Sequence, residues 1–266
     1  MKIRRIYGLA LRQFYLLRAT PTRFVQIFAW GALDLILWGF ITKYLAATGG
    51  GSVVVSTFLG AILLWDFLGR VMQSIDTAFF EDVWSRNFLN MFGSPISPKE
   101  YIAGLVAVGI LTSTLSFVVM IALATLLFGF SIFSYGIALL PFVLILYLSG
   151  VALGILGIAI VLRLGPSAEW FIWPIPAVLA PFVGIFYPLS VLPYWMQAIG
   201  QLLPPSYVFE GMRSVIQGHG FSLSALGLGA LLALFCIALA YRYFMHVYKR
   251  ALRDGLIARY SAESVG

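Results

Sequence analysis

The sequence predicts an all-α integral membrane protein with six transmembrane helices. Of its 266 residues, 61% are hydrophobic and only 10% are charged, and the mean hydropathy is +0.98. Soluble domains contain about 25% charged residues, so a soluble fold of this length could not bury so much apolar surface. A helix that crosses a bilayer needs roughly 20 mostly apolar residues. Six runs meet this requirement, at residues 24–46, 53–74, 101–129, 136–162, 170–191 and 223–246.

Residues 1–22 precede the first span and predict an amphipathic helix lying along the membrane surface. One helical face carries the apolar side chains of Ile3, Ile6, Tyr7, Ala10, Phe14 and Leu17. The rest of the helix carries the basic side chains of Lys2, Arg4, Arg5, Arg12 and Arg18. Such a helix binds the anionic inner leaflet of a membrane, so membrane lipids are expected partners.

The distribution of basic residues predicts the orientation of the chain. With the N-terminus in the cytoplasm, every Lys and Arg lies on or near the cytoplasmic side except Lys43 and Arg213. Cytoplasmic connections carry an excess of Lys and Arg, so both termini are expected in the cytoplasm, with residues 247–266 as a tail. Topology therefore accounts for the net charge of +7, and no nucleic-acid partner is expected.

Residues 76–100 join the second and third spans and predict a cytoplasmic helix followed by a corner. An apolar stripe at helical spacing runs through Phe79, Phe80, Val83, Trp84, Phe88 and Phe92. In the stretch MFGSPISPKEYIAG, Ser97 is a good N-cap, Pro98 suits the first helical position, and Glu100 completes a capping box. Such a corner would transmit a displacement of the helix at 76–92 to the third span. A well-capped helix start with no further role explains the same residues equally well.

Residues 192–222 predict two short helices rather than a seventh span. Pro204 and Pro205 stop a helix over 194–203, and Ser206 can cap a second helix through about Gln217. Neither is long enough to cross a bilayer at about 1.5 Å per residue. We expect a re-entrant pair that enters from the outer side, where protein or water must cover its non-helical backbone. The alternative is a loop lying on the outer leaflet.

The sequence lacks the motifs of nucleotide hydrolysis and of metal binding. No lysine follows a glycine, so a phosphate-binding loop ending in Gly-Lys-Ser/Thr is missing. Cys236 is a single cysteine, and His219 and His246 are far apart without other ligands at suitable spacing. We therefore expect no metal site in this chain.

A few ionisable residues fall inside the predicted spans, where charge is costly and marks function by default. Asp34 lies midway along the first span without a charged neighbour in sequence, and it is the candidate pathway residue. Asp66 and Arg70 are four residues apart, so they are expected to pair along the second span.

Two stretches carry a resemblance to a known family. They are FGSPISPKEYIAG between the second and third spans and YPLSVLPYWMQAIGQLLPPSYVFEGMRSVIQG before the last span. Together with the basic N-terminal helix and the order of the spans, they resemble the permease subunits of type-2 ABC exporters. These permeases are related to polysaccharide, drug and lipid exporters.

The resemblance implies a single permease domain over residues 1–266 in a bacterial or archaeal cytoplasmic membrane, with two permease copies forming the path. ATP and Mg would be bound by a separate cytoplasmic ABC ATPase, so this chain would need no cofactor and would not itself be an enzyme. The resemblance assigns coupling and ATPase contact to Glu81, Asp82, Trp84, Arg86, Asn87, Pro95, Pro98 and Glu100. It assigns the outer lid to Pro193, Trp195, Pro204, Pro205, Glu210 and Arg213.

Two other functions stay open at the level of sequence. The chain could be a polytopic assembly or regulatory subunit without transport, or a proton-coupled carrier. For an exporter, a lipid, a lipid-linked glycan or an amphipathic drug would each suit the sequence. The residues do not distinguish a homodimer from a heterodimer with a related permease.

Overall fold

The computed structural model describes residues 2–19, 21–85, 91 and 94–254, with the side chains of residues 17, 19, 21–27 and 49–56 outside the description. The α-helices are α1 (Ile3–Ala19), α2 (Pro21–Leu45), α3 (Gly51–Trp84), α5 (Pro98–Phe128), α6 (Leu139–Leu164), α7 (Glu169–Ile172), α8 (Ile175–Val183), α9 (Tyr194–Leu202), α10 (Pro204–Ile216) and α11 (Leu223–Arg253). A π-helical segment, Ala46–Gly50, joins α2 to α3, and a 3₁₀ segment, Ile132–Ala138, leads into α6.

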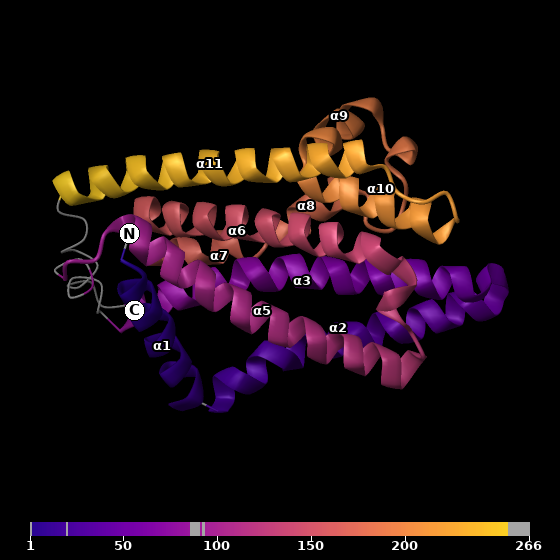
Figure 1. The fold of residues 1–266 in the computed structure, drawn as a ribbon, viewed down its shortest axis with the longest axis horizontal. Coiled ribbons are helices and arrows are strands. Elements are labelled where there is room, and N and C mark those ends of the chain that lie inside the picture. Colours follow the sequence, from indigo (N-terminus) through magenta and orange to yellow (C-terminus); the bar gives the residue numbers. More distant parts are fainter. Residues whose placement is uncertain (1, 20, 86–90, 92–93, 255–266) are drawn as a thin grey trace.

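The long helices form a bundle in which α6 packs between α3 and α11, and α5 packs against α3 (Figure 1). Helix α2 lies against α3 and α5. Helix α1 crosses the end of the bundle where α5 begins, and the C-terminal end of α11 reaches the same end (Figure 1). Helices α9 and α10 lie at the opposite end, as does the turn between α2 and α3 (Figure 1). The two ends of the bundle therefore separate the two segments in which function was predicted.

Glycines on α6 allow it to approach α3 closely. A Cβ atom on Gly150 would lie 2.8 Å from the Leu68 carbonyl oxygen, and one on Gly157 would lie 2.6 Å from Asp76 Oδ1. Gly154 faces Ile75 in the same row. Small residues let helix backbones pack tightly where the surrounding lipid gives no hydrophobic driving force. Helices α3 and α6 are therefore closely packed along this row of glycines.

Among the described residues, four helices are long and apolar enough to cross a membrane: Thr57–Trp84, Pro98–Phe128, Ile132–Leu164 and Leu223–Arg253. They correspond to the second, third, fourth and sixth predicted spans. The first predicted span is helical as α2 but is not one of the four. The structure thus identifies an all-helical, multi-pass membrane protein.

The fifth predicted span, 170–191, is not one continuous helix and is not among the four candidate spanning helices. Pro174 separates α7 from α8, and α8 ends at Gly184 in the left-handed conformation with φ of 70°. Proline lacks an amide hydrogen and clashes with the preceding turn, which explains the break. Residues 169–183 still lead from the α1 end of the bundle toward α9 (Figure 1).

The separate helix predicted to start near residue 76 is also absent, because α3 continues without interruption to Trp84. No glycine or proline breaks the chain there, and Phe79, Phe80 and Val83 stay buried on the face that Val71 and Ile75 begin. The apolar stripe thus belongs to the end of a long core helix. The end of the stripe, Phe88 and Phe92, lies outside the described residues, as do the predicted contact residues Arg86 and Asn87.

The two short helices expected within 192–222 are present as α9 and α10. The predicted cap was wrong, however. Helix α10 begins at Pro204, and the Ser206 hydroxyl instead donates a hydrogen bond to the Gly200 carbonyl oxygen at 2.7 Å. Ser206 thereby fastens α10 to the last turn of α9.

Candidate functional site

The candidate site is the corner at which α1, the end of α3 and the start of α5 meet. Ser97 caps α5 as the sequence predicts: its hydroxyl accepts from the Glu100 amide, and the Glu100 carboxylate accepts from the Ser97 amide at 3.1 Å. Pro98 occupies the first turn. Two orphan amides at the helix start are thereby satisfied reciprocally.

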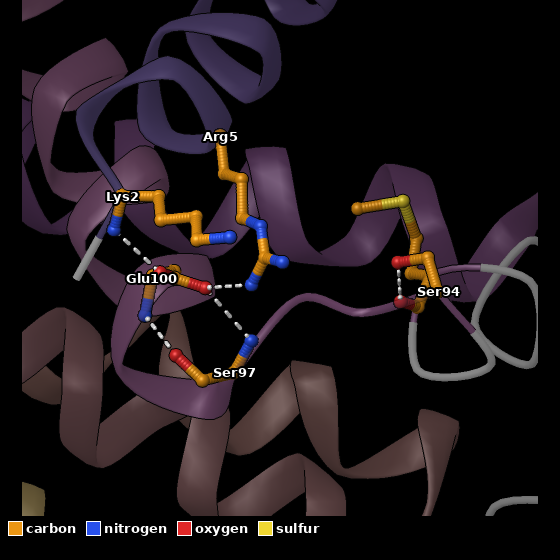
Figure 2. A network of polar contacts seen from close by, with 6 residues as sticks. Lys2, Arg5, Ser94, Ser97 and Glu100 are labelled. Atoms are coloured by element: carbon orange, nitrogen blue, oxygen red, sulfur yellow. Dashed lines mark hydrogen bonds and ion pairs between the residues drawn. The ribbon is translucent and has the colours of Figure 1, made fainter.

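Glu100 also ties α5 to the N-terminal helix, as Figure 2 shows. One carboxylate oxygen accepts from the Lys2 backbone amide at 2.7 Å, and the other accepts from Arg5 Nη1 at 3.1 Å. The Glu100 side chain is only 4% exposed, so these bonds are shielded from water on one side. A single carboxylate therefore both caps α5 and holds the start of α1.

A second connection lies deeper, between α1 and α3. Asp82 is fully buried, and its carboxylate pairs with Arg12 and accepts a hydrogen bond from the Tyr101 hydroxyl at 2.7 Å. Gln13 donates to the Ala78 carbonyl oxygen at 3.1 Å. Leu9 packs where Gly104 of α5 leaves room, because a Cβ there would lie 2.9 Å from Leu9 Cβ. Helices α1, α3 and α5 are therefore joined by buried polar contacts at this end.

The end of α3 is joined to the α7–α8 segment as well. Trp84 Nε1 donates to a Glu169 carboxylate oxygen at 3.2 Å. Phe80 contacts the rings of Trp84 and Trp173, with centroid distances of 5.7 and 5.9 Å. A displacement of the end of α3 would thus reach both α5 and the proline-broken segment.

The residues predicted to touch an ATPase divide into buried and accessible ones. Glu81 and Asp82 are buried, and Glu100 faces α1. Trp84, at 44% exposed, and Pro95 are accessible to a partner, and Pro98 is partly buried. Lys99, which was not predicted to touch the ATPase, is exposed beside them.

Sequence reasoning missed the partner groups of the corner, Arg5, Arg12 and Tyr101. Arg5 and Arg12 are seven residues apart on α1, close to two helical turns, and this spacing is the signal that one helix edge carries both.

The segment that the resemblance assigns to an outer lid, around α9 and α10 at the opposite end of the bundle, has its own polar connections. Glu210 accepts from the Leu189 amide and from Arg213 Nη2, each at 2.8 Å, and Arg213 Nη1 donates to the Gly184 carbonyl oxygen at 2.7 Å. Glu210 and Arg213 therefore form an ion pair within α10. Pro193 caps α9, Pro204 and Pro205 form the buried first turn of α10, and Trp195 contacts Phe182.

The ionisable residues inside the bundle take different positions. Asp66 and Arg70 form the predicted pair, with 3.3 Å between Arg70 Nε and Asp66 Oδ1. Asp34 is exposed and has no hydrogen bond or ion pair to any described residue. The described part of the chain contains no group of three or more His, Cys, Asp or Glu side chains that could hold a metal ion.

Comparison with family models decides the class of protein. The model of the ABC-2 type transporter matches residues 9–216, which include the end of α3, the start of α5, α1 from Leu9 onward, and helices α9 and α10. The chain belongs to the ABC-2 type transporter family. It is therefore an ABC transporter permease, the membrane component that works with an ABC ATPase. A comparison with curated proteins gave no match.

In an ABC permease, the geometry of the corner bears on how movement could pass between the ATPase and the membrane helices. Nucleotide-driven movement must enter the membrane part through contacts with the ATPase. At the corner, α1, α3 and α5 are joined by buried ionic and hydrogen-bonding groups, so a displacement of one is resisted by the others. Tightly packed helices change between discrete arrangements rather than deforming gradually. The ends of α1, α3 and α5 at the corner are therefore suited to move together.

Proposed function

We propose that the chain is the permease subunit of an ATP-driven exporter that carries an amphipathic or lipid-linked substrate out across a bacterial or archaeal cytoplasmic membrane. The observation that carries the proposal is the corner at which Asp82 and Glu100 bind α1. Because both acids are satisfied internally, the ATPase contact is made by accessible residues around them, Trp84, Pro95 and Lys99.

In this proposal, α2 and the α7–α8 segment complete six crossings, both termini are cytoplasmic, and two copies of the permease enclose the path. The placement of α1 and the end of α11 at one end of the bundle supports this topology (Figure 1). Exposed apolar side chains near the end of α2, including Phe40 and Tyr44, are available for lipid or for a second copy. Closure of the ATPases upon ATP and Mg binding would push on the corner and tilt α3 and α5.

The exporter proposal is tested by co-purifying the chain with candidate soluble ABC ATPases from the same organism and measuring their association. Lys99→Glu reverses a charge at the accessible edge of the corner and is expected to weaken association by about tenfold, since exposed charges govern docking. Lys43→Glu makes the same change on an exposed residue at the opposite end of the bundle, and it should leave association unchanged. Equal association of both variants with the ATPase would refute the assignment of the corner.

A proton-coupled carrier is the second candidate, and Asp76 is the observation that favours it. Its side chain is fully buried on α3, and neither carboxylate oxygen has a hydrogen-bond partner among the described residues. Buried acids of this kind form proton relays in carriers. Vesicles that contain this chain without an ATPase decide between the two functions. An exporter permease moves no solute under a proton gradient alone, whereas a carrier does.

A further inference from the structure

One face of α2 places a carboxylate between two indole rings. Trp30, Asp34 and Trp38 are spaced four residues apart, so their side chains follow one another on successive turns of the same helix face. Trp30 is 67% exposed and Asp34 is exposed. Trp38 is half-buried and stacks on Phe186, with ring centroids 5.3 Å apart and an interplanar angle of 20°. Trp30, Asp34 and Trp38, which we call the α2 row, thus combine one accessible indole ring, one indole ring held by stacking, and a carboxylate between them.

The charge of Asp34 is not balanced by the neighbouring ionic groups. Arg70 is the nearest basic residue on α3, and it is bonded to Asp66. It lies against Gly31 of α2, where a Cβ would be 2.8 Å from Arg70 Nη2. Because Arg70 is paired with Asp66, the described residues give Asp34 no basic partner.

Lipid cannot be the surroundings of this carboxylate. Asp34 is the fourteenth residue of a helix of 25, and a charged side chain at the centre of a membrane helix costs about 2.5–3.5 kcal/mol. Such residues face a water-filled path or a partner of opposite charge. Trp30 and Trp38 each lie about one helical turn from Asp34 along α2. They are therefore too close to the centre of the membrane for the aromatic belts found at membrane interfaces.

We propose that Trp30, Asp34 and Trp38 bind an organic cation with an apolar body, and that such a cation is the substrate class of the transporter. This inference rests on the proposed export function. A cationic centre is attracted both to the carboxylate and to the electron-rich faces of the indoles, and both attractions are strengthened where water is scarce. The exposed Leu33 and Leu37 beside Asp34 would contact the apolar part of the molecule.

Other ligand classes fit the row less well. An anion would be repelled by Asp34. A divalent metal needs several oxygen ligands, and the described residues offer no group of three ligating side chains. A neutral sugar would leave the carboxylate without a counter-charge. The combination of one acid with aromatic faces matches the recognition of quaternary ammonium and related cations.

The test uses two ions of matched size and opposite charge, tetraphenylphosphonium and tetraphenylborate. The full-length chain is placed in nanodiscs of neutral lipid, and saturable binding of labelled tetraphenylphosphonium is measured with and without competitors. We expect saturable binding that excess unlabelled phosphonium displaces and that tetraphenylborate does not. Asp34→Asn is expected to raise Kd at least about tenfold, and Trp30→Ala about threefold to tenfold.

Two controls separate a binding role from a structural one. Asp34→Glu keeps the charge and should retain binding, while Asp254→Asn removes an exposed acid at the end of α11 and should leave Kd unchanged. Phosphonium binding that is absent, unaffected by Asp34→Asn or equally displaced by tetraphenylborate would overturn the inference. Since the measurement needs no ATPase, its failure is distinct from a failure of the exporter proposal, which the ATPase-association assay reports.

Discussion

The pair of Arg12 and Asp82 offers the sharpest test of the corner. Breaking a buried ion pair by removing one partner costs about 3–5 kcal/mol, because the other charge is left without compensation. Here the Asp82 side chain is fully buried, but that of Arg12 is 29% exposed, and Tyr101 continues to donate to the carboxylate. We therefore expect Arg12→Met to lower the free energy of unfolding by a smaller amount, about 2–3 kcal/mol.

The matched control is Arg250→Met on α11. Arg250 pairs with Asp254, but the two side chains are 72% and 49% exposed, so its loss should cost less than about 1 kcal/mol. Both variants are compared by reversible unfolding of the full chain in mixed micelles during titration with SDS. Adding Asp82→Asn to Arg12→Met completes a double-mutant cycle, and we expect a coupling energy of about 1–2 kcal/mol. Equal losses for Arg12→Met and Arg250→Met, or no coupling in the cycle, would refute the reasoning.

Three further predictions address other parts of the fold. Gly157→Ala should destabilise the chain by about 1–3 kcal/mol, because its Cβ would lie 2.6 Å from Asp76 Oδ1. The control is Gly227→Ala, whose Cβ would have no atom within 4 Å and which should be neutral or slightly stabilising in the same SDS titration. Ser97→Ala should cost about 0.5–2 kcal/mol through loss of the α5 cap, and Ser97→Thr should restore most of it; equal stability of the two variants would contradict a capping role. Arg213→Gln should speed amide hydrogen exchange over residues 184–189, because the hydrogen bond from Arg213 Nη1 to the Gly184 carbonyl oxygen is lost. Lys43→Gln is the control. Exchange over 184–189 that is the same in both variants would show that Arg213 does not hold the segment.

Several features of this protein follow from sequence alone because they depend on contacts local in the chain. The capping box of Ser97 and Glu100 and the Asp66–Arg70 pair join residues three or four apart, and both are present. The second, third, fourth and sixth spans are set by length and hydropathy, and candidate spanning helices occur at each. The prolines that separate α9 from α10 also act locally, through their fixed φ and missing amide hydrogen.

Tertiary packing decided what local patterns leave open. An apolar stripe at helical spacing is equally compatible with a separate surface helix and with the end of a buried one. Only contact with the rest of the bundle shows that Phe79 and Phe80 are buried residues of the long helix α3. The partners of Asp82 and Glu100 are as far as 70 and 98 residues away, so no spacing rule could connect them to α1. Two acids that the sequence assigned to a docking surface are instead part of the internal support of the corner, since a buried carboxylate requires bonded partners wherever the fold can supply them.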